Sequence, residues 1–141
     1  MSRPLVIRLR NRVEELRRVP AALEKFAITE RLPLSLLGSL SLVIEEVVCN
    51  IVFHAYEDDA EHEIELRLAV EGDALTLEVE DDGRDFDPFS VPAPDLGAPL
   101  PVRPVGGLGI ALIRRLMDEV RHERRRGRNL LTLTKRGVRE A

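Results

Sequence analysis

The sequence predicts an α+β fold, a two-layer sandwich in which helices cover one face of a mostly antiparallel sheet. Three observations support this. Several short runs alternate apolar and polar residues, and three longer segments repeat apolar residues at helical spacing. The segments follow the order strand, helix, helix, two strands, loop, helix, two strands. With 141 residues, of which 44% are hydrophobic, we expect one domain spanning residues 1–141.

The N-terminal part begins with a strand and continues with two helical segments. Residues 3–10 place alternate apolar side chains on one side, as a strand does. Residues 11–29 have helical periodicity, but Pro20 predicts a kink or two short pieces. A long apolar helix follows, with Ser35 as its expected N-cap and its end near Tyr56.

Two alternating runs form the middle of the chain. Residues 62–72 and 73–83 are separated by a turn at Gly72, so they predict a β-hairpin. Their inward-facing side chains are expected to be Ile64, Leu66, Leu68, Val70, Leu75, Leu77 and Val79.

The last third begins with a loop. Six of the nine prolines lie between Pro88 and Pro104 without periodicity, and a loop of that length inside a domain is usually functional or disordered. A helix follows, opened by the glycine-rich residues 106–109. Two strand-like runs around Gly127 then close the chain.

Composition excludes several classes of protein. A net charge of −4 gives no general attraction to nucleic acid or to anionic membranes, so we expect no direct contact with either. The single cysteine, Cys49, cannot form an intrachain disulfide, which fits a reducing compartment. No apolar run reaches the expected length of a membrane span or has the form of a signal peptide. We therefore expect a cytoplasmic protein.

The long helix carries polar residues within an apolar run, "EEVVCNIVFHAY". At about 100° per residue, Glu46 and Asn50 lie on one stripe, whereas Glu45 lies on another side. An amide oxygen and a carboxylate are the donors that Mg²⁺ prefers, and a carboxylate can also deprotonate a nucleophile. The same pair could equally be a solvated stripe of an amphipathic helix.

A second polar residue occupies an inward position. Continuing the alternation of the second hairpin strand makes Asp81 the next buried residue, whereas Asp82 faces outward. A buried carboxylate requires hydrogen-bond donors, and the exocyclic amine of a purine would supply one. Gly83 permits a sharp turn or the close approach of a ligand. A plain turn that ends the hairpin remains the alternative.

The third feature is the glycine-rich turn before the last helix. Gly106, Gly107 and Gly109 would let backbone N–H groups converge at a helix N-terminus, where phosphate binds favourably. Such turns are common, so this feature has little weight alone. It is not a dinucleotide-binding fingerprint, because a proline-rich loop precedes it instead of a strand.

Taken together and in this order, the three features resemble the GHKL ATPase superfamily, which shares the Bergerat nucleotide fold. The resemblance covers about residues 5–136. Its small stand-alone branch, the anti-sigma-factor serine/threonine kinases, is most similar in the stretches "EEVVCNIVFHAY", "EDDGRDFDP" and "GGLGIALIRRLMDEV".

The resemblance implies a role for each motif. Asn50 would bind the Mg²⁺ that bridges the ATP phosphates, and Glu46 would be the general base. Asp81 would accept the adenine amino group, with Gly83 beside the ring, and residues 84–105 would form the ATP lid. The phosphates would be held by Gly106, Gly107, Leu108 and Gly109.

The implied function is an ATP-dependent protein serine/threonine kinase that acts as an anti-sigma factor. It would phosphorylate an anti-anti-sigma protein, sequester a sigma factor and form a homodimer. Two departures from the wider superfamily pattern are Asp85 and Val105, which stand where glycines are usual; Asp85 is normal for the anti-sigma branch. The proline-rich lid has few donors for a γ-phosphate, which leaves open a nucleotide-gated interaction switch without kinase activity.

Overall fold

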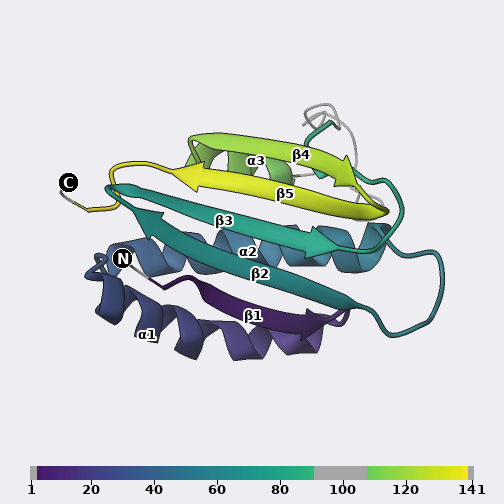
Figure 1. The fold of residues 1–141 in the computed structure, drawn as a ribbon, viewed down its shortest axis with the longest axis horizontal. Helices are drawn as coiled ribbons and strands as arrows, with labels where there is room; N and C mark the ends of the chain where they lie inside the picture. Colours follow the sequence, from purple (N-terminus) through teal and green to yellow (C-terminus); the bar gives the residue numbers. More distant parts are fainter. Residues whose placement is uncertain (1–2, 91–107, 140–141) are drawn as a thin grey trace.

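The computed structural model describes residues 3–90 and 108–139, and in them a five-stranded sheet with the order β1-β2-β3-β5-β4 (Figure 1). All four strand pairings are antiparallel. The strands are β1 (Leu5–Arg10), β2 (Glu63–Glu71), β3 (Ala74–Asp81), β4 (Glu119–Arg125) and β5 (Arg128–Lys135). The β3–β5 pairing skips β4, so β5 lies in the interior of the sheet and β4 at its edge.

The α-helices lie on one face of the sheet and are α1 (Val19–Glu30), α2 (Ser35–His54) and α3 (Leu108–Leu116) (Figure 1). Two short 3₁₀ segments, η1 (Val13–Arg18) and η2 (Pro88–Ser90), precede α1 and follow β3, respectively. Helix α2 contacts both α1 and α3. The predicted α+β two-layer sandwich is therefore confirmed.

Alternation along the strands places the core between the sheet and α2. Every inward residue predicted for the β2–β3 hairpin is buried, and the outward positions are partly or fully exposed. Helix α2 contributes a continuous buried face. The core side chains of α2 are Leu36, Leu40, Val43, Ile44, Val47, Val48 and Ile51. This packing holds α2 rigidly across the sheet and fixes the direction of its remaining faces.

By length and composition alone, α2 could span a membrane, with a mean hydropathy of 1.9 over its most apolar window. The expectation that no segment has this length is therefore wrong. Half of that window is buried inside the domain, as expected for a core helix that is apolar on more than one side.

The predicted breaks in the helices are partly confirmed. Pro20 divides residues 11–29 into two pieces, since η1 ends at Arg18 and α1 begins with Pro20 in its first turn. Ser35 is not the N-cap of α2: Leu34 occupies that position in a helical conformation, and no side chain caps the helix. Helix α2 ends at His54, two residues before the predicted end.

The beginning of the predicted lid is described and the rest is not. Residues 84–90 leave β3 and form η2, which is partly buried through Pro88 and Phe89. Residues 91–107, which contain most of the proline-rich segment and Val105, lie outside the described residues.

Candidate functional site

The Glu46–Asn50 stripe of α2 faces α3. Glu46 is partly buried and Asn50 is 7% exposed, whereas Glu45 is exposed on another side of the helix. The Asn50 Nδ2 atom donates to the Glu46 backbone carbonyl at 2.7 Å. This bond uses the amide nitrogen and leaves the oxygen Oδ1 as the group that can ligate a cation.

Helix α3 begins directly against Glu46. A Cβ atom built on Gly109 would lie within 2.9 Å of the Glu46 carboxyl carbon and closer still to Oε2. Any side chain at this position would therefore force the Glu46 carboxylate to move aside. Because Gly109 lies in the first turn of α3, the carboxylate is next to the end of a helix where N–H groups point outward and the dipole is positive.

Asp81 ends β3 and is 1% exposed, as its inward position predicts. Its Oδ1 atom accepts hydrogen bonds from the Gly83 backbone N–H at 2.9 Å and from Asn129 Nδ2 at 3.0 Å. Burial raises the pKa of the Asp81 carboxyl, and these two bonds oppose that shift. Among the described residues, no hydrogen bond reaches Oδ2, which can accept a donor from a ligand.

Gly83 joins this strand end to the end of α2. A Cβ on Gly83 would lie 2.8 Å from the Ala55 Cβ and would also overlap the Ala55 carbonyl oxygen. That carbonyl accepts the Arg84 backbone N–H at 2.8 Å, and Arg84 Nε donates to the His54 carbonyl at 2.8 Å. Arg84 thus bonds the end of α2 through its guanidinium.

Asn129 on β5 was not predicted as a site residue. It is 1% exposed, lies directly opposite Asp81 in the β3–β5 register and bonds it. The signal was available in part, because Asn129 precedes the inward residues Leu131 and Leu133 at the same parity. Its partner could not be known without the strand order.

The remaining predicted residues are only partly described. Gly106 and Gly107 lie outside the described residues, and for Leu108 the structure gives only its place as the first residue of α3. The structure therefore brings Glu46, Asn50 and Gly109 together, and it joins Asp81 and Gly83 to the C-terminal end of α2.

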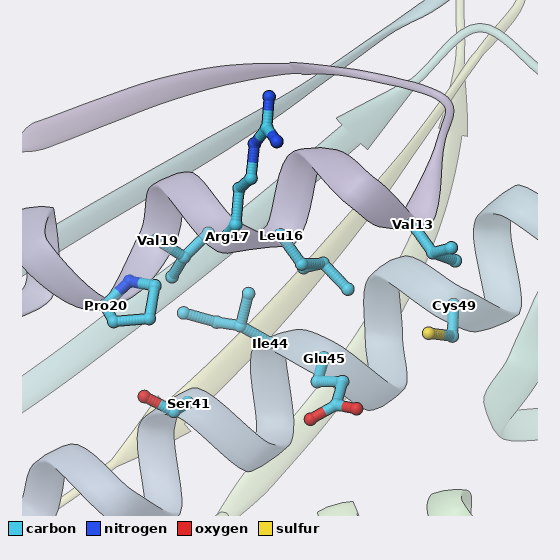
Figure 2. Close-up of a pocket in the computed structure, with 9 residues that line it drawn as sticks. All are labelled: Val13, Leu16, Arg17, Val19, Pro20, Ser41, Ile44, Glu45 and Cys49. Atoms are coloured by element: carbon cyan, nitrogen blue, oxygen red, sulfur yellow. The ribbon is translucent and has the colours of Figure 1, made fainter.

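A separate cavity of about 360 Å³ lies on another side of α2, between that helix and the η1–α1 segment (Figure 2). None of the predicted site residues lines it. Its walls are mostly apolar and consist of Val13, Leu16, Arg17, Val19, Pro20, Ser41, Ile44, Glu45 and Cys49. Cys49 is buried there.

Comparison with known proteins identifies the family. The family model described as "Histidine kinase-like ATPase domain" matches residues 9–135. The chain is 33% identical over 119 residues to the serine/threonine-protein kinase BtrW of Bordetella bronchiseptica, covering 84% of each protein. It is 39% identical over 93 residues to the serine-protein kinase RsbW of Bacillus subtilis, covering 62% of this chain and 58% of that protein.

A solved structure supports the same assignment. It is the crystal structure of the RsbU and RsbW domains of a Mycobacterium tuberculosis protein. The match covers 99% of this chain and 34% of the Mycobacterium tuberculosis chain. The TM-score is 0.68 and the sequence identity 25%. The chain therefore belongs to the histidine kinase-like ATPase family, in the RsbW-like branch of anti-sigma-factor serine/threonine kinases that its motifs resemble.

Proposed function

We propose that this chain uses ATP and Mg²⁺ to phosphorylate a serine or threonine hydroxyl of an anti-anti-sigma protein, and that it also binds a sigma factor. The observation that carries the proposal is the convergence of Glu46, Asn50 and the start of α3 at Gly109. Phosphoryl transfer depends mainly on positioning and charge neutralisation, for which this small set suffices.

Each of these residues has a distinct task in the proposed reaction. Glu46 accepts the proton of the substrate hydroxyl as its oxygen attacks the γ-phosphorus, and ADP leaves. Asn50 would hold the cation through Oδ1, and Asp81 Oδ2 would accept a hydrogen bond from the amino group of adenine. Bound Mg²⁺ would neutralise charge on the phosphates. The N-terminus of α3, with Gly106, Gly107 and Leu108 before Gly109, would bind phosphate oxygens.

The amide oxygen of Asn50 suits Mg²⁺ as a hard donor, and protein Mg²⁺ sites need few such ligands because substrate phosphates and water supply the others. The Glu46 carboxylate lies one helical turn away on the same stripe. Under this proposal residues 1–141 act as one ATP-binding domain in the cytoplasm, residues 84–105 serve as its lid, and two copies form a homodimer.

The test is transfer of labelled γ-phosphate from ATP–Mg²⁺ to the cognate antagonist protein. Glu46→Ala should lower the transfer rate about 10²–10⁴-fold, because the general base is lost, while ATP still binds. Glu45→Ala is the matched control, because the Glu45 carboxylate lies on another side of α2 from Glu46. This variant should transfer phosphate at the normal rate.

Normal transfer by Glu46→Ala would contradict the role of Glu46. If the unmodified protein bound ATP but transferred no phosphate to the antagonist, the interaction switch without kinase activity would be the better description. Sedimentation of the purified chain tests the homodimer.

A further inference from the structure

We propose that Asn129 is a positioning residue that presents Asp81 to the nucleotide base and ties it to the root of the lid. The inference rests on the proposed role of Asp81 as the acceptor of the base amino group. It adds a residue from β5, a strand in which the sequence motifs identify no function.

The side chain of Asn129 uses its full hydrogen-bonding capacity within the protein. Its Nδ2 donates to Asp81 Oδ1 at 3.0 Å and to the Arg84 carbonyl at 2.7 Å. Its Oδ1 accepts the Phe86 backbone N–H at 3.2 Å and faces His122 Nε2 at 2.9 Å. An asparagine amide offers two donors and an acceptor oxygen with two lone pairs, so all four positions are occupied.

These partners fix the orientation of the amide. The Asp81 carboxylate and the Arg84 carbonyl can only accept, and the Phe86 N–H can only donate, so the amide nitrogen must face the first two. His122 must then donate from Nε2 to the same amide oxygen. Reversing the amide would place like groups opposite one another at the contacts with Asp81, Arg84 and Phe86.

The two oxygens of the Asp81 carboxylate therefore differ: one is hydrogen-bonded within the protein, and the other can bond a ligand. Asn129 and Gly83 both bond Oδ1, so the carboxylate plane is set and Oδ2 is the atom left for a ligand. The amide donates without bringing a positive charge. Asp81 therefore remains a strong acceptor, whereas a lysine or arginine at this position would neutralise it.

The same side chain also holds the first residues of the lid. The Arg84 carbonyl and the Phe86 N–H belong to the three residues that follow Gly83. Arg124 on β4 adds a bond to the Gly83 carbonyl at 2.7 Å. The base acceptor and the start of the lid are thus attached to one buried amide on the β4–β5 hairpin.

Other ionisable groups face Asp81 and are relevant to any test by pH. Asp82 beside it favours the protonated form of Asp81, and Arg124 favours the ionised form. Tyr56 follows α2, and burial raises the pKa of its phenol, so it stays neutral over the range tested. His122 contacts Asn129 and not Asp81.

The experiment measures the dissociation constants of ADP and IDP by calorimetry between pH 5.5 and 8. Adenine offers an amino donor and hypoxanthine a carbonyl acceptor at the same ring position. An ionised Asp81 therefore prefers ADP, whereas a protonated one can donate to IDP. The ratio of the two dissociation constants reports the ionisation and the orientation of the Asp81 carboxylate. The measurement requires no kinase activity.

We expect the unmodified chain to prefer ADP and Asp81→Asn to lose that preference. Asn129→Ala should reduce the preference about tenfold at neutral pH and shift its loss to a higher pH, because one of the two bonds to the carboxylate is gone. Asn129→Ser keeps a hydroxyl donor, so its preference for ADP should lie between those of Asn129→Ala and the unmodified chain. Leu133→Ala, a fully buried position on the same strand, should lower stability and leave both the preference and its pH dependence unchanged.

Two results would overturn the proposal, and they are distinguishable. If Asp81→Asn loses the preference while Asn129→Ala keeps both the preference and its pH dependence, Asn129 has only a structural role. If Asp81→Asn itself keeps the preference for ADP, the proposed role of Asp81 fails, and that of Asn129 with it.

Discussion

At the scale of the residue, His62 has a carboxylate against each ring nitrogen. Nε2 lies 2.8 Å from Asp58 Oδ1, Nδ1 lies 3.1 Å from Asp82 Oδ1, and the ring stacks on Tyr56 at 4.4 Å between centroids. Only the doubly protonated ring can donate to both carboxylates, so the bonds raise the pKa of His62. The cation links the acidic loop after α2 to the residue beside Asp81.

This arrangement predicts that stability falls as pH rises above neutrality. The folded pKa of His62 is above its unfolded value of about 6.5, so its contribution is complete below about pH 6.5 and is lost as pH rises through the folded pKa. We expect Tm to drop by about 2–5 °C between pH 6 and 8, a modest effect because the partners are solvent-exposed. Calorimetric melting over this range measures it.

His62→Gln should flatten this dependence, and Asp58→Asn should reduce it. Asp59→Asn, which changes the neighbouring exposed acid, should leave the dependence in place. A pH dependence unchanged in His62→Gln would show that another group is responsible.

The sequence predicted correctly which way a side chain faces where helical or strand periodicity alone decides it. Helical phase separated Glu46 from Glu45, and strand parity placed Asp81 inside. It could not find Asn129 or the His62 contacts, because these depend on which strand lies beside which. The β3–β5 register that sets Asp81 opposite Asn129 follows from a non-sequential strand order.

At the scale of the element, two glycines permit close contacts of different kinds. Gly83 approaches the backbone carbonyl and Cβ of Ala55, which cannot move without shifting the end of α2. Gly109 approaches the flexible end of the Glu46 side chain. The first contact joins the end of β3 to the end of α2, and the second positions the proposed general base, Glu46.

These contacts predict opposite effects of substitution by alanine. Gly83→Ala should lower the free energy of unfolding by about 1–3 kcal/mol, because the added methyl group overlaps backbone. Gly109→Ala should leave stability nearly unchanged but lower phosphate transfer about 10²-fold, because the Glu46 carboxylate must move aside. Urea unfolding and the transfer assay measure the two effects.

Gly38→Ala is the control for helix propensity. It lies within α2 with no atom within 4 Å of an added Cβ, so it should raise stability by up to about 1 kcal/mol. A loss of stability in Gly109→Ala as large as that in Gly83→Ala would contradict the distinction drawn between the two contacts.

The existence of the helices and strands followed from the sequence more reliably than their ends. Pro20 marked the boundary between η1 and α1 because a ring at that position removes a hydrogen bond. Ser35 misled, since it is the first residue of α2 and Leu34 before it is the N-cap, in a helical conformation and without a side-chain bond; packing on the sheet stabilises the helix instead.

At the scale of the whole molecule, the C-terminal segment joins parts distant in sequence. Arg139 Nη1 donates to the Glu30 carbonyl at 2.6 Å, and its Nε donates to the Gly72 carbonyl at 2.9 Å. The same guanidinium lies 3.6 Å from the Glu30 carboxylate, and Glu30 is 7% exposed. One side chain thus connects the end of α1 to the β2–β3 turn.

Arg139→Ala should lower the free energy of unfolding by about 1–3 kcal/mol, because it leaves a buried carboxylate and two carbonyls without this donor. Arg136→Ala is the matched control: its bridge to Glu119 is exposed on both sides, so it should change stability far less than Arg139→Ala. Equal losses in chemical unfolding would refute the special role of Arg139.

The bond between Asp81 and Asn129 joins residues 48 positions apart, across a segment that contains the proposed lid and α3. Closing so long a segment costs more chain entropy than closing the short turn of the β2–β3 hairpin. Local hairpins are therefore expected to form earlier during folding. The acceptor for the base would then be completed among the last steps. A ligand that needs this acceptor would slow unfolding without accelerating folding, and would prolong the lifetime of each finished molecule in the cell.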